Sequence, residues 1–327
     1  MHLIPYSLTN MRIPLLILLV SLTTTAKTGI AQSTLYFEWI HQADSLTNRK
    51  EYKKAAAFYD KALPQANRKY ITYDWYNAVC IYALAGENDK AFQVLTQLAN
   101  MSRFYEGRSL LADADLTSLH QDTRWENLRR LFLHKDSVAD LKINHTLKSE
   151  LRHAFEEDQR YRRPLDSVIQ KYGANSPQVD SLENNMAKAD SQNLILVRSI
   201  LDKYGWLGPD IIGGIGSSTL FAVIQHADLA PGVQEKYLPY LRRAVEKGDA
   251  DPSDLALLED RILVGQHKPQ LYGSQIKTND QGVSAPFPIA DSSHVDSRRA
   301  KMGLGPLKYY VQLFNPTPAA TPTPTAQ

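Results

Sequence analysis

Apolar residues recur at helical spacing along most of this 327-residue chain, and the pattern predicts a mainly α fold. Between residues 34 and 132 the apolar positions fall into short helices of a repeated kind. Two sets of positions that lie 36 residues apart carry the repeat: Trp39, Ala55, Tyr59 and Ala62 in the first, and Trp75, Ala91, Leu95 and Leu98 in the second. A fixed offset of this length predicts two successive helix pairs.

These helix pairs resemble the tetratricopeptide repeat, in which a small residue in the second helix lets the two helices approach closely. Ala55 and Ala91 match that small position, and Gly86 would end the first helix of the second pair. Ala43 and Val79 stand where the family commonly has glycine. The resemblance implies a scaffold that binds a peptide or a partner protein on its concave face. Ankyrin-like hairpins, plain helical hairpins and a purely structural spacer remain alternative interpretations.

The segment 110–128 predicts an element that closes this array. Asp115 and Asp122 have the residue type and position of helix N-caps. A stripe of apolar residues at helical spacing follows, formed by Trp125, Leu128 and Leu131. A terminal helix of this kind would shield the open end of a repeat core from water.

A second group of helices predicts a helical domain over residues 145–314. Apolar spacing indicates helices over 145–172 with a kink or break at Pro164, and then over 177–204, 217–227, 231–248, 252–265 and 291–302. Residues 270–277 and 283–289 predict a small β-hairpin. Residues 315–327 are rich in proline and threonine and predict a disordered tail.

The first 31 residues predict a cleavable signal peptide. Arg12 precedes an apolar run over 13–22, which is too short to span a bilayer as a helix but fits the hydrophobic region of such a peptide. Small residues at Gly29 and Ala31 favour cleavage after Ala31. We therefore expect a periplasmic or extracellular protein, and no later segment is apolar enough to predict a transmembrane span.

The charge balance excludes two classes of partner. Without residues 1–31 the chain holds 35 basic and 35 acidic residues, and it has no basic block. A neutral chain of this kind predicts neither nucleic-acid binding nor a polybasic membrane anchor.

Cys80 is the single cysteine, so no internal disulfide and no cysteine-based zinc site is possible. The nine histidines form no HExxH pair, and we expect neither a metal nor a cofactor. A metal site built from His226, Asp228 and a distant ligand is the alternative.

Several short motifs in the C-terminal part occur in a fixed order. They are Asp158-Gln159-x-x-Arg162, Trp206-Leu207-Gly208, Gln225-His226-Ala227-Asp228, Asp260-Arg261, Pro269 to Gln275 and Val295 to Arg299. This order is similar to that of a bacterial family, domain of unknown function 6624, over most of residues 145–312. Ser274 stands where that family would have threonine. The resemblance implies a domain and a functional site within it, but it implies no reaction.

His226 is the strongest candidate for chemistry. It follows an apolar helix, and an imidazole there can transfer protons near neutral pH, which predicts a catalytic acid or base. A buried histidine that only caps the helix is the alternative. Arg261 interrupts an apolar run and needs a carboxylate partner, for which Asp158 and Asp190 are the candidates. A structural salt bridge and an anion-binding arginine are both open interpretations of Arg261.

The remaining candidates are polar residues that helical spacing or loop position would bring to the same place. Asp158 and Arg162 share one helix face, as do Asp190 and Asn193. The candidate ligand-binding residues are completed by Gln225, Asp228, Gln270, Tyr272 and Gln275. Solvated helix faces and turn chemistry near Gly273 are the alternatives. The glycine run 213–218 is interpreted as a flexible lead into the next helix, because no lysine follows it as in a phosphate-binding loop.

Two functions follow from these patterns. The first is an exported envelope protein whose C-terminal domain and repeat scaffold bind a protein or ligand. The second is a hydrolase-like enzyme in which His226 is the acid or base and Arg261 holds an anionic group. Both predict that the candidate side chains open into one common cavity.

Overall fold

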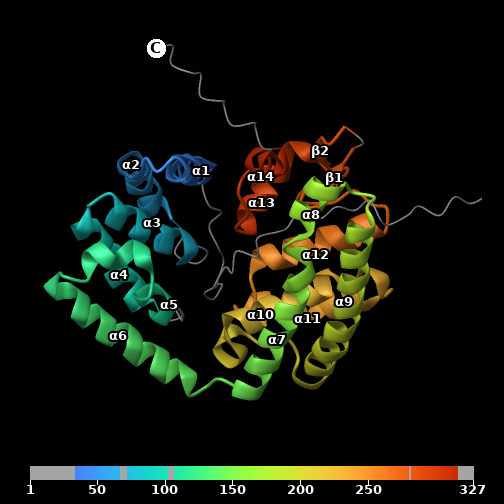
Figure 1. Cartoon of the computed structure of the whole chain (residues 1–327), viewed down its shortest axis with the longest axis horizontal. Coiled ribbons are helices and arrows are strands. Elements are labelled where there is room, and N and C mark those ends of the chain that lie inside the picture. The colour runs from blue at the N-terminus through green and yellow to red at the C-terminus, as the bar shows by residue number, and fades with distance from the viewer. Residues whose placement is uncertain (1–33, 67–71, 102–106, 280, 316–327) are drawn as a thin grey trace, which may run out of the picture.

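The computed structural model describes residues 34–66, 72–101, 107–279 and 281–315 (Figure 1). The expected signal peptide over 1–31 lies outside the described residues, as does the expected tail apart from residue 315. The expectation of a mainly α chain with one small β-hairpin is confirmed. Among the described residues, no helix combines the length and apolar character needed to cross a membrane.

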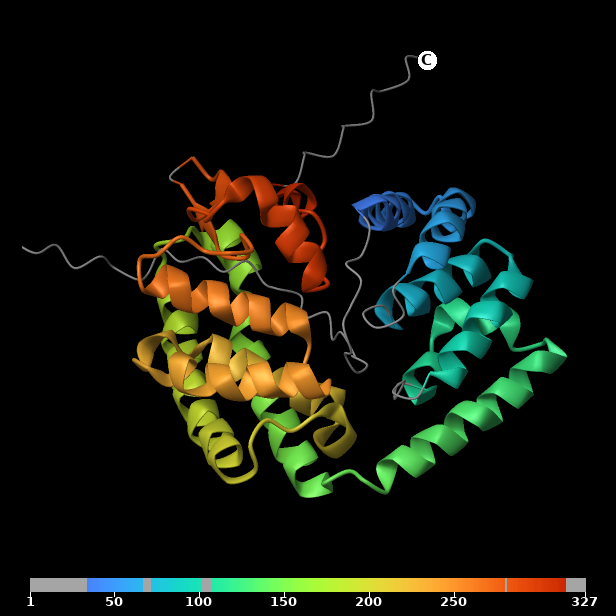
Figure 2. The ribbon, with the colours of Figure 1, turned by 180° about the vertical axis from the view of Figure 1, so that it is seen from behind.

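The N-terminal half consists of helix pairs. The helices are α1 (Thr34–Asn48), α2 (Tyr52–Ala62), α3 (Thr72–Leu84), α4 (Asn88–Asn100), α5 (Gly107–Leu111) and α6 (Thr123–Asp140), with 3-10 turns at Leu63–Gln65 and Ala114–Leu119. Helix α1 packs on α2, α2 on α3, and α3 on α4. The long helix α6 runs along one side of this half and leads to the second half (Figures 1 and 2).

Small buried residues allow the paired helices to approach each other. Ala55 and Ala91, at the two positions expected to be small, have no exposed surface, and neither have Ala43 and Val79. Gly86 ends α3 with φ of +77°, in the left-handed region that glycine adopts without steric cost. The assignment of these hairpins to the tetratricopeptide repeat stays a prediction.

Two details of the closing segment differ from expectation. Asp113, not Asp115, caps the 3-10 turn, because its carboxylate accepts the backbone N–H of Asp115. Asp122 caps α6 as expected. The buried stripe of α6 continues from Trp125 and Leu128 to Phe132, whereas the expected Leu131 is exposed. The packed face therefore follows the spacing i, i+3, i+7 rather than i, i+3, i+6.

The C-terminal half is a bundle with an irregular segment on one side. Its helices are α7 (His145–Arg162), α8 (Leu165–Tyr172), α9 (Pro177–Tyr204), α10 (Pro209–Gln225), α11 (Val233–Lys247), α12 (Pro252–Gly265), α13 (Val295–Lys301) and α14 (Leu307–Phe314), with 3-10 turns at Ala227–Leu229 and Ser292–His294. Helices α7, α9 and α10 pack against one another, and α11 packs on α12. Strands β1 (Ile276–Thr278) and β2 (Ser284–Pro286) form an antiparallel pair within the expected hairpin.

Local chain chemistry explains where these helices begin and end. Pro164 separates α7 from α8, and Ser176 caps α9, whose first residue is a proline. The expected start of α10 at residue 217 is wrong, because the helix begins at Pro209 and includes most of the glycine run. Only Gly213 departs from helical geometry, with φ of +73°, and it kinks the helix there. Helix α14 was not expected from the sequence.

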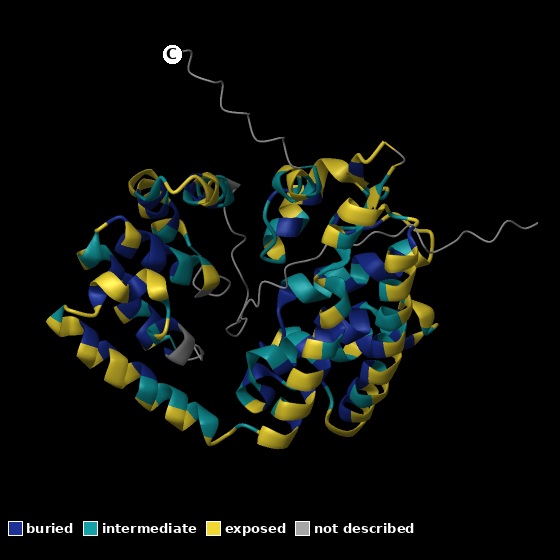
Figure 3. Ribbon diagram, viewed as in Figure 1, coloured by how far each residue is buried: buried dark blue, intermediate teal, exposed yellow. Residues whose placement is uncertain are grey.

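The two halves bury separate apolar clusters, and the dark-blue residues of Figure 3 gather inside each half. The first extends from Tyr36 to Phe132 and includes the helix pairs. The second extends from Leu147 to Ile262 and lies among α7, α9, α10, α11 and α12. The limits given for the two domains from the sequence stay predictions.

Replacing Gly86 with alanine tests the backbone requirement at the end of α3. A Cβ at Gly86 or at Gly265 would meet no atom within 4 Å, so the two sites differ only in backbone conformation. We expect Gly86→Ala to lower the free energy of unfolding by about 1 kcal/mol, because φ is positive there. Gly265→Ala is the matched control and should cost nothing. Urea unfolding measures both, and equal effects would contradict a left-handed residue at position 86.

Candidate functional site

His226 lies at the end of α10, where its ring meets a carboxylate from another helix. Its Nδ1 atom lies 2.9 Å from Oδ1 of Asp158 on α7. The Asp158 side chain is only 1% exposed, whereas that of His226 is 15% exposed. An ionised carboxylate can only accept hydrogen bonds, so Nδ1 carries the proton of this contact. A neutral His226 therefore keeps its Nε2 lone pair for another group.

Arg162 joins this pair to a third helix. It follows Asp158 by one helical turn, and its Nη1 atom donates to the Asp158 carboxylate at 3.0 Å and to the Asp158 carbonyl at 2.8 Å. Its Nη2 atom lies 2.8 Å from both carboxylate oxygens of Asp190 on α9. Asn193, one turn further along α9, donates to the carbonyl of Ala154 on α7 at 3.0 Å. The polar face of α7 that carries Asp158 and Arg162 thus meets the polar face of α9 that carries Asp190 and Asn193.

These groups form one network, here called the His226 cluster: Asp158, Arg162, Asp190 and His226. Potential ligand atoms of Asp158, Asp190 and His226 lie within 4.8 Å of one another, a spacing compatible with a metal ion. However, Gln159 donates to the second oxygen of Asp158 at 2.8 Å, and Arg162 contacts both oxygens of Asp190. Each carboxylate oxygen thus already has a donor, and Arg162 supplies a positive charge beside both carboxylates. The four side chains therefore form one hydrogen-bonded ion-pair network.

The two carboxylates of the cluster are shifted in opposite directions. Burial raises the pKa of Asp158, but the neighbouring His226 and Arg162 outweigh burial, and the pKa falls below its ordinary value. Burial also raises the pKa of Asp190, and there Arg162 and His226 offset only part of the effect, so the pKa stays above its ordinary value. Two nearby carboxyl groups with separated pKa values are typical of acid–base sites.

Arg261 belongs to a second network, which includes Asp228 and Gln275. Its Nε atom donates to Oδ1 of Asp228 at 2.9 Å, its Nη2 atom to Oδ2 of the same carboxylate, and its Nη1 atom to Oε1 of Gln275 at 3.0 Å. The expected partners Asp158 and Asp190 are therefore wrong for Arg261. Asp228 was singled out as a ligand residue, and its position two residues after His226 brings the two networks close along the chain.

The segment 270–275 is held by buried polar side chains. Asp260, on α12, accepts the backbone N–H groups of Leu271, Tyr272 and Ser274. Gln270 is fully buried, and its amide donates to the carbonyls of Gln275 and Phe287 and accepts the N–H of Gln275. These bonds satisfy backbone groups that no helix or strand pairs. Gln270 therefore shapes the segment, although the sequence suggested a ligand contact.

The side chains of two further candidates make no hydrogen bond with the His226 cluster in the described part of the chain. The hydroxyl of Tyr272 donates to Glu259 at 3.1 Å. Gln225 is buried, and its Oε1 atom has no hydrogen-bond partner among the described residues. The structure thus brings four of the candidates into one cluster and places Asp228, Arg261 and Gln275 in a second.

Sequence reasoning missed Asp260 and Arg299 as organising residues. Arg299 is 2% exposed, and its guanidinium donates to the carbonyls of Tyr272 and Gly305. Burial lowers its pKa to about 10. Both residues lie within the family-like motifs at Asp260-Arg261 and at 295–299. A charged residue inside an otherwise apolar helix is the sequence signal that can identify such a residue, and Asp260 on α12 shows this signal.

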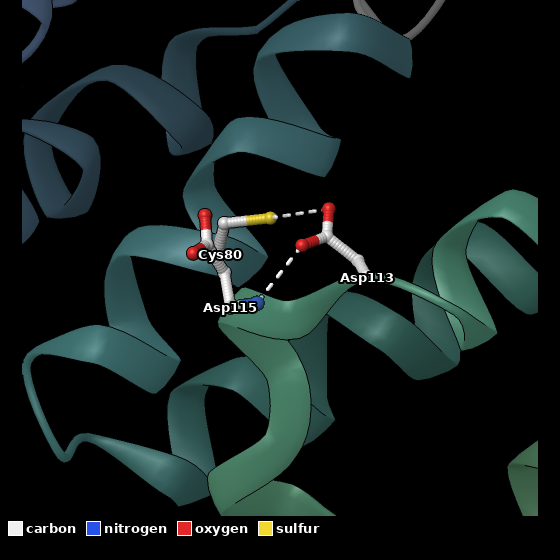
Figure 4. A group of neighbouring side chains, drawn as sticks. All are labelled: Cys80, Asp113 and Asp115. Atoms are coloured by element: carbon white, nitrogen blue, oxygen red, sulfur yellow. Dashed lines mark hydrogen bonds between the residues drawn. The ribbon is translucent and has the colours of Figure 1, made fainter.

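A second group with metal-like residue types lies in the repeat half. Cys80, Asp113 and Asp115 lie together, and the thiol of Cys80 contacts the Asp113 carboxylate at 3.7 Å (Figure 4). Tyr76 also donates to Asp113 at 2.6 Å, and the N–H of Asp115 donates at 2.9 Å. Burial raises the pKa of Cys80 well above its ordinary value, so a protonated thiol is favoured. These contacts explain why the three residues lie together: Asp113 caps the 3-10 turn Ala114–Leu119 and accepts hydrogen bonds from its neighbours.

The comparison with known families agrees with the motif order. Residues 145–319 match the model of DUF6624, described as a family of unknown function. The chain belongs to this family. No curated protein and no solved structure matches the chain significantly. All four residues of the His226 cluster and the network of Arg261 lie within the DUF6624 segment.

Replacing Asp158 with asparagine tests the central ion pair. The lowered pKa means that Asp158 stabilises the folded chain above its ordinary pKa near 4, and that this contribution is lost as the pH falls through the folded-state value. We expect Asp158→Asn to cost about 3 kcal/mol at pH 7, because the positive partners lose their buried carboxylate. The cost should shrink below pH 3.

The neighbouring Glu157→Gln serves as the control, since Glu157 pairs with the more exposed Arg160. Urea unfolding at pH 2 and at pH 7 gives the comparison. An Asp158→Asn cost that is the same at pH 2 and at pH 7 would show that the carboxylate is not ionised in the folded chain.

Proposed function

We propose that this DUF6624 member is a hydrolase-like enzyme in which His226 accepts and donates a proton during cleavage of a polar substrate. The observation that carries the proposal is the 2.9 Å contact of Nδ1 with the buried carboxylate of Asp158. A carboxylate in this position fixes the tautomer and orientation of the ring and stabilises the imidazolium that forms after proton uptake. Nε2 is then the atom that meets the substrate.

The rest of the cluster supports acid–base work. Arg162 and Asp190 hold each other beside the histidine, and their side chains are 16% and 25% exposed, which leaves them within reach of a ligand. The raised pKa of Asp190 makes this carboxyl a second group that can hold a proton nearer neutral pH. Because the three side chains other than Asp158 are partly exposed, the substrate approaches from their side.

Arg261 takes a positioning role in this proposal. Its Nε, Nη1 and Nη2 atoms all donate to protein acceptors, so an anionic substrate group would have to displace Asp228 to reach it. The pair instead fixes Asp228, and with it the turn that follows His226. We place the enzyme in the cell envelope, because residues 1–31 have the pattern of a cleavable signal peptide.

Hydrolysis by the mature chain, residues 32–327, tests the enzyme proposal. The assay is a panel of chromogenic carboxylic esters, phosphoesters and peptide anilides. For the class that is cleaved, we expect His226→Gln to lower kcat/KM by at least about 100-fold, the usual size of an acid–base contribution. His153→Gln is the matched control, since His153 is exposed on α7 of the same domain. Full turnover by His226→Gln, or cleavage of no class by the wild type, would sink the proposal.

A second function, the binding of a partner protein, is favoured by α6. Leu131 and Val138 lie two turns apart on one face of this helix, and Leu141 follows its last residue; they are 38%, 48% and 85% exposed. Exposed apolar residues in a row are typical of protein interaction surfaces. We therefore propose that the repeat half also binds a partner along this face of α6.

Recovery of an envelope partner tests this second function. We expect the immobilised mature chain to retain a stoichiometric partner, and the double variant Val138→Glu, Leu141→Glu to lose it, because two buried charges would oppose the contact. Lys142→Glu, an exposed change beside the apolar face, is the control. Equal recovery by wild type and the double variant would exclude this face of α6.

A further inference from the structure

The first helix of the repeat half lies beside the last helix of the DUF6624 domain (Figures 1 and 2). The rings of His41 on α1 and Tyr309 on α14 are stacked, with centroids 4.0 Å apart and planes at 21°. Glu38, on the same side of α1, lies 3.2 Å from the Nζ atom of Lys308. Two segments more than 260 residues apart in the chain thus make a specific contact.

The contact continues into the turn before α14. A Cβ at Gly305 would lie 3.3 Å from the ring of Phe37, so the side chain of Phe37 packs directly on this glycine. The carbonyl of Gly305 accepts from Nε of the buried Arg299, whose Nη1 atom donates to the carbonyl of Tyr272. The backbone that α1 covers is therefore bonded, through one guanidinium, to the segment 270–275.

Helix α14 itself holds the same segment. The hydroxyl of Tyr310, the residue after the stacked Tyr309, donates to the carbonyl of Ser274 at 2.8 Å. Leu307 packs against Gly273, where a Cβ would come within 2.8 Å of it. Gln275, the residue after Ser274, accepts a hydrogen bond from Arg261, and Arg261 also donates to Asp228, two residues after His226. A continuous series of contacts thus joins α1 to Asp228, two residues after His226.

We propose that docking of α1 on α14 holds the segment 270–275 in place, so that the repeat half regulates the His226 cluster. The docking contact consists of one ring stack, one exposed ion pair and one glycine contact, which is weak enough to open reversibly. A partner that binds the repeat half and displaces α1 would loosen the segment and with it the Arg261–Asp228 pair. The regulatory part of this inference rests on the proposed function, whereas the docking part does not.

Hydrogen exchange of the full mature chain tests the docking directly. The amides of Leu271, Tyr272 and Ser274 all donate to Asp260, so their exchange reports on the order of this segment. We expect His41→Ala to speed their exchange by about two- to tenfold, the effect of losing one aromatic contact. Gln42→Ala, on the exposed side of α1, should leave the exchange unchanged.

A charge exchange separates docking from simple unfolding of the repeat half. Glu38→Lys and Lys308→Glu should each speed exchange at 271–274 by about two- to fivefold, and the double variant should restore it, because the pair is reformed with reversed sign. Unchanged exchange in His41→Ala and in both single reversals would overturn the inference. So would acceleration that the double reversal fails to restore.

The turnover assay then separates this inference from the proposed function. If the single reversals change both exchange and kcat/KM and the double variant restores both, docking regulates the site. If exchange responds but the wild type cleaves no substrate class, the enzyme proposal fails and the docking stands. If exchange responds and kcat/KM stays constant, the regulatory part is overturned.

Discussion

The buried carboxylate of Asp158 is the constraint around which the DUF6624 domain is organised. With 1% of its side chain exposed, this charge would be costly without partners. His226 from α10, Arg162 from α7 and Gln159 supply them, and Arg162 extends the network to Asp190 on α9. Three of the five helices that bury the domain's apolar cluster are thus tied together by a network around one acid. The same pairing that stabilises the bundle also orients the histidine, which unites folding and the proposed chemistry.

Buried charge plays a comparable part in the irregular segment that follows α12. The described residues of the range 266–294 form only short strands and turns, so many backbone groups lack a regular partner. Asp260 accepts three of the N–H groups, and Arg298 and Arg299 donate to carbonyls along the segment. Helix α14 contacts the segment through Tyr310 and Leu307, and α1 contacts α14. The proposed regulation follows from this construction, because a segment held by a few polar contacts responds to the loss of any one of them.

Much of the secondary structure could be predicted from the sequence, because it depends on local chemistry. Helix α9 spans Pro177–Tyr204 as predicted, since a capping serine, a first-turn proline and a final glycine mark its ends. The start of α10 was misplaced because a glycine run weakens helix propensity without forbidding a packed helix. Helix α14 was missed because its eight residues are too few to show a clear helical period, and because its position depends on contacts with distant segments.

The sequence by itself determined the helical periodicity, the balanced charge and the polar residues that stand out within apolar helices. These properties depend on residue type and spacing over a few turns. Only the tertiary structure decided which polar groups meet. His226 pairs with Asp158 across 68 residues, and Arg261 pairs with Asp228 across 33, although Asp158 and Asp190 were equally plausible partners for Arg261 from their charge. The choice depends on how helices cross in the bundle, because a carboxylate binds whichever donor the packing brings within about 3 Å.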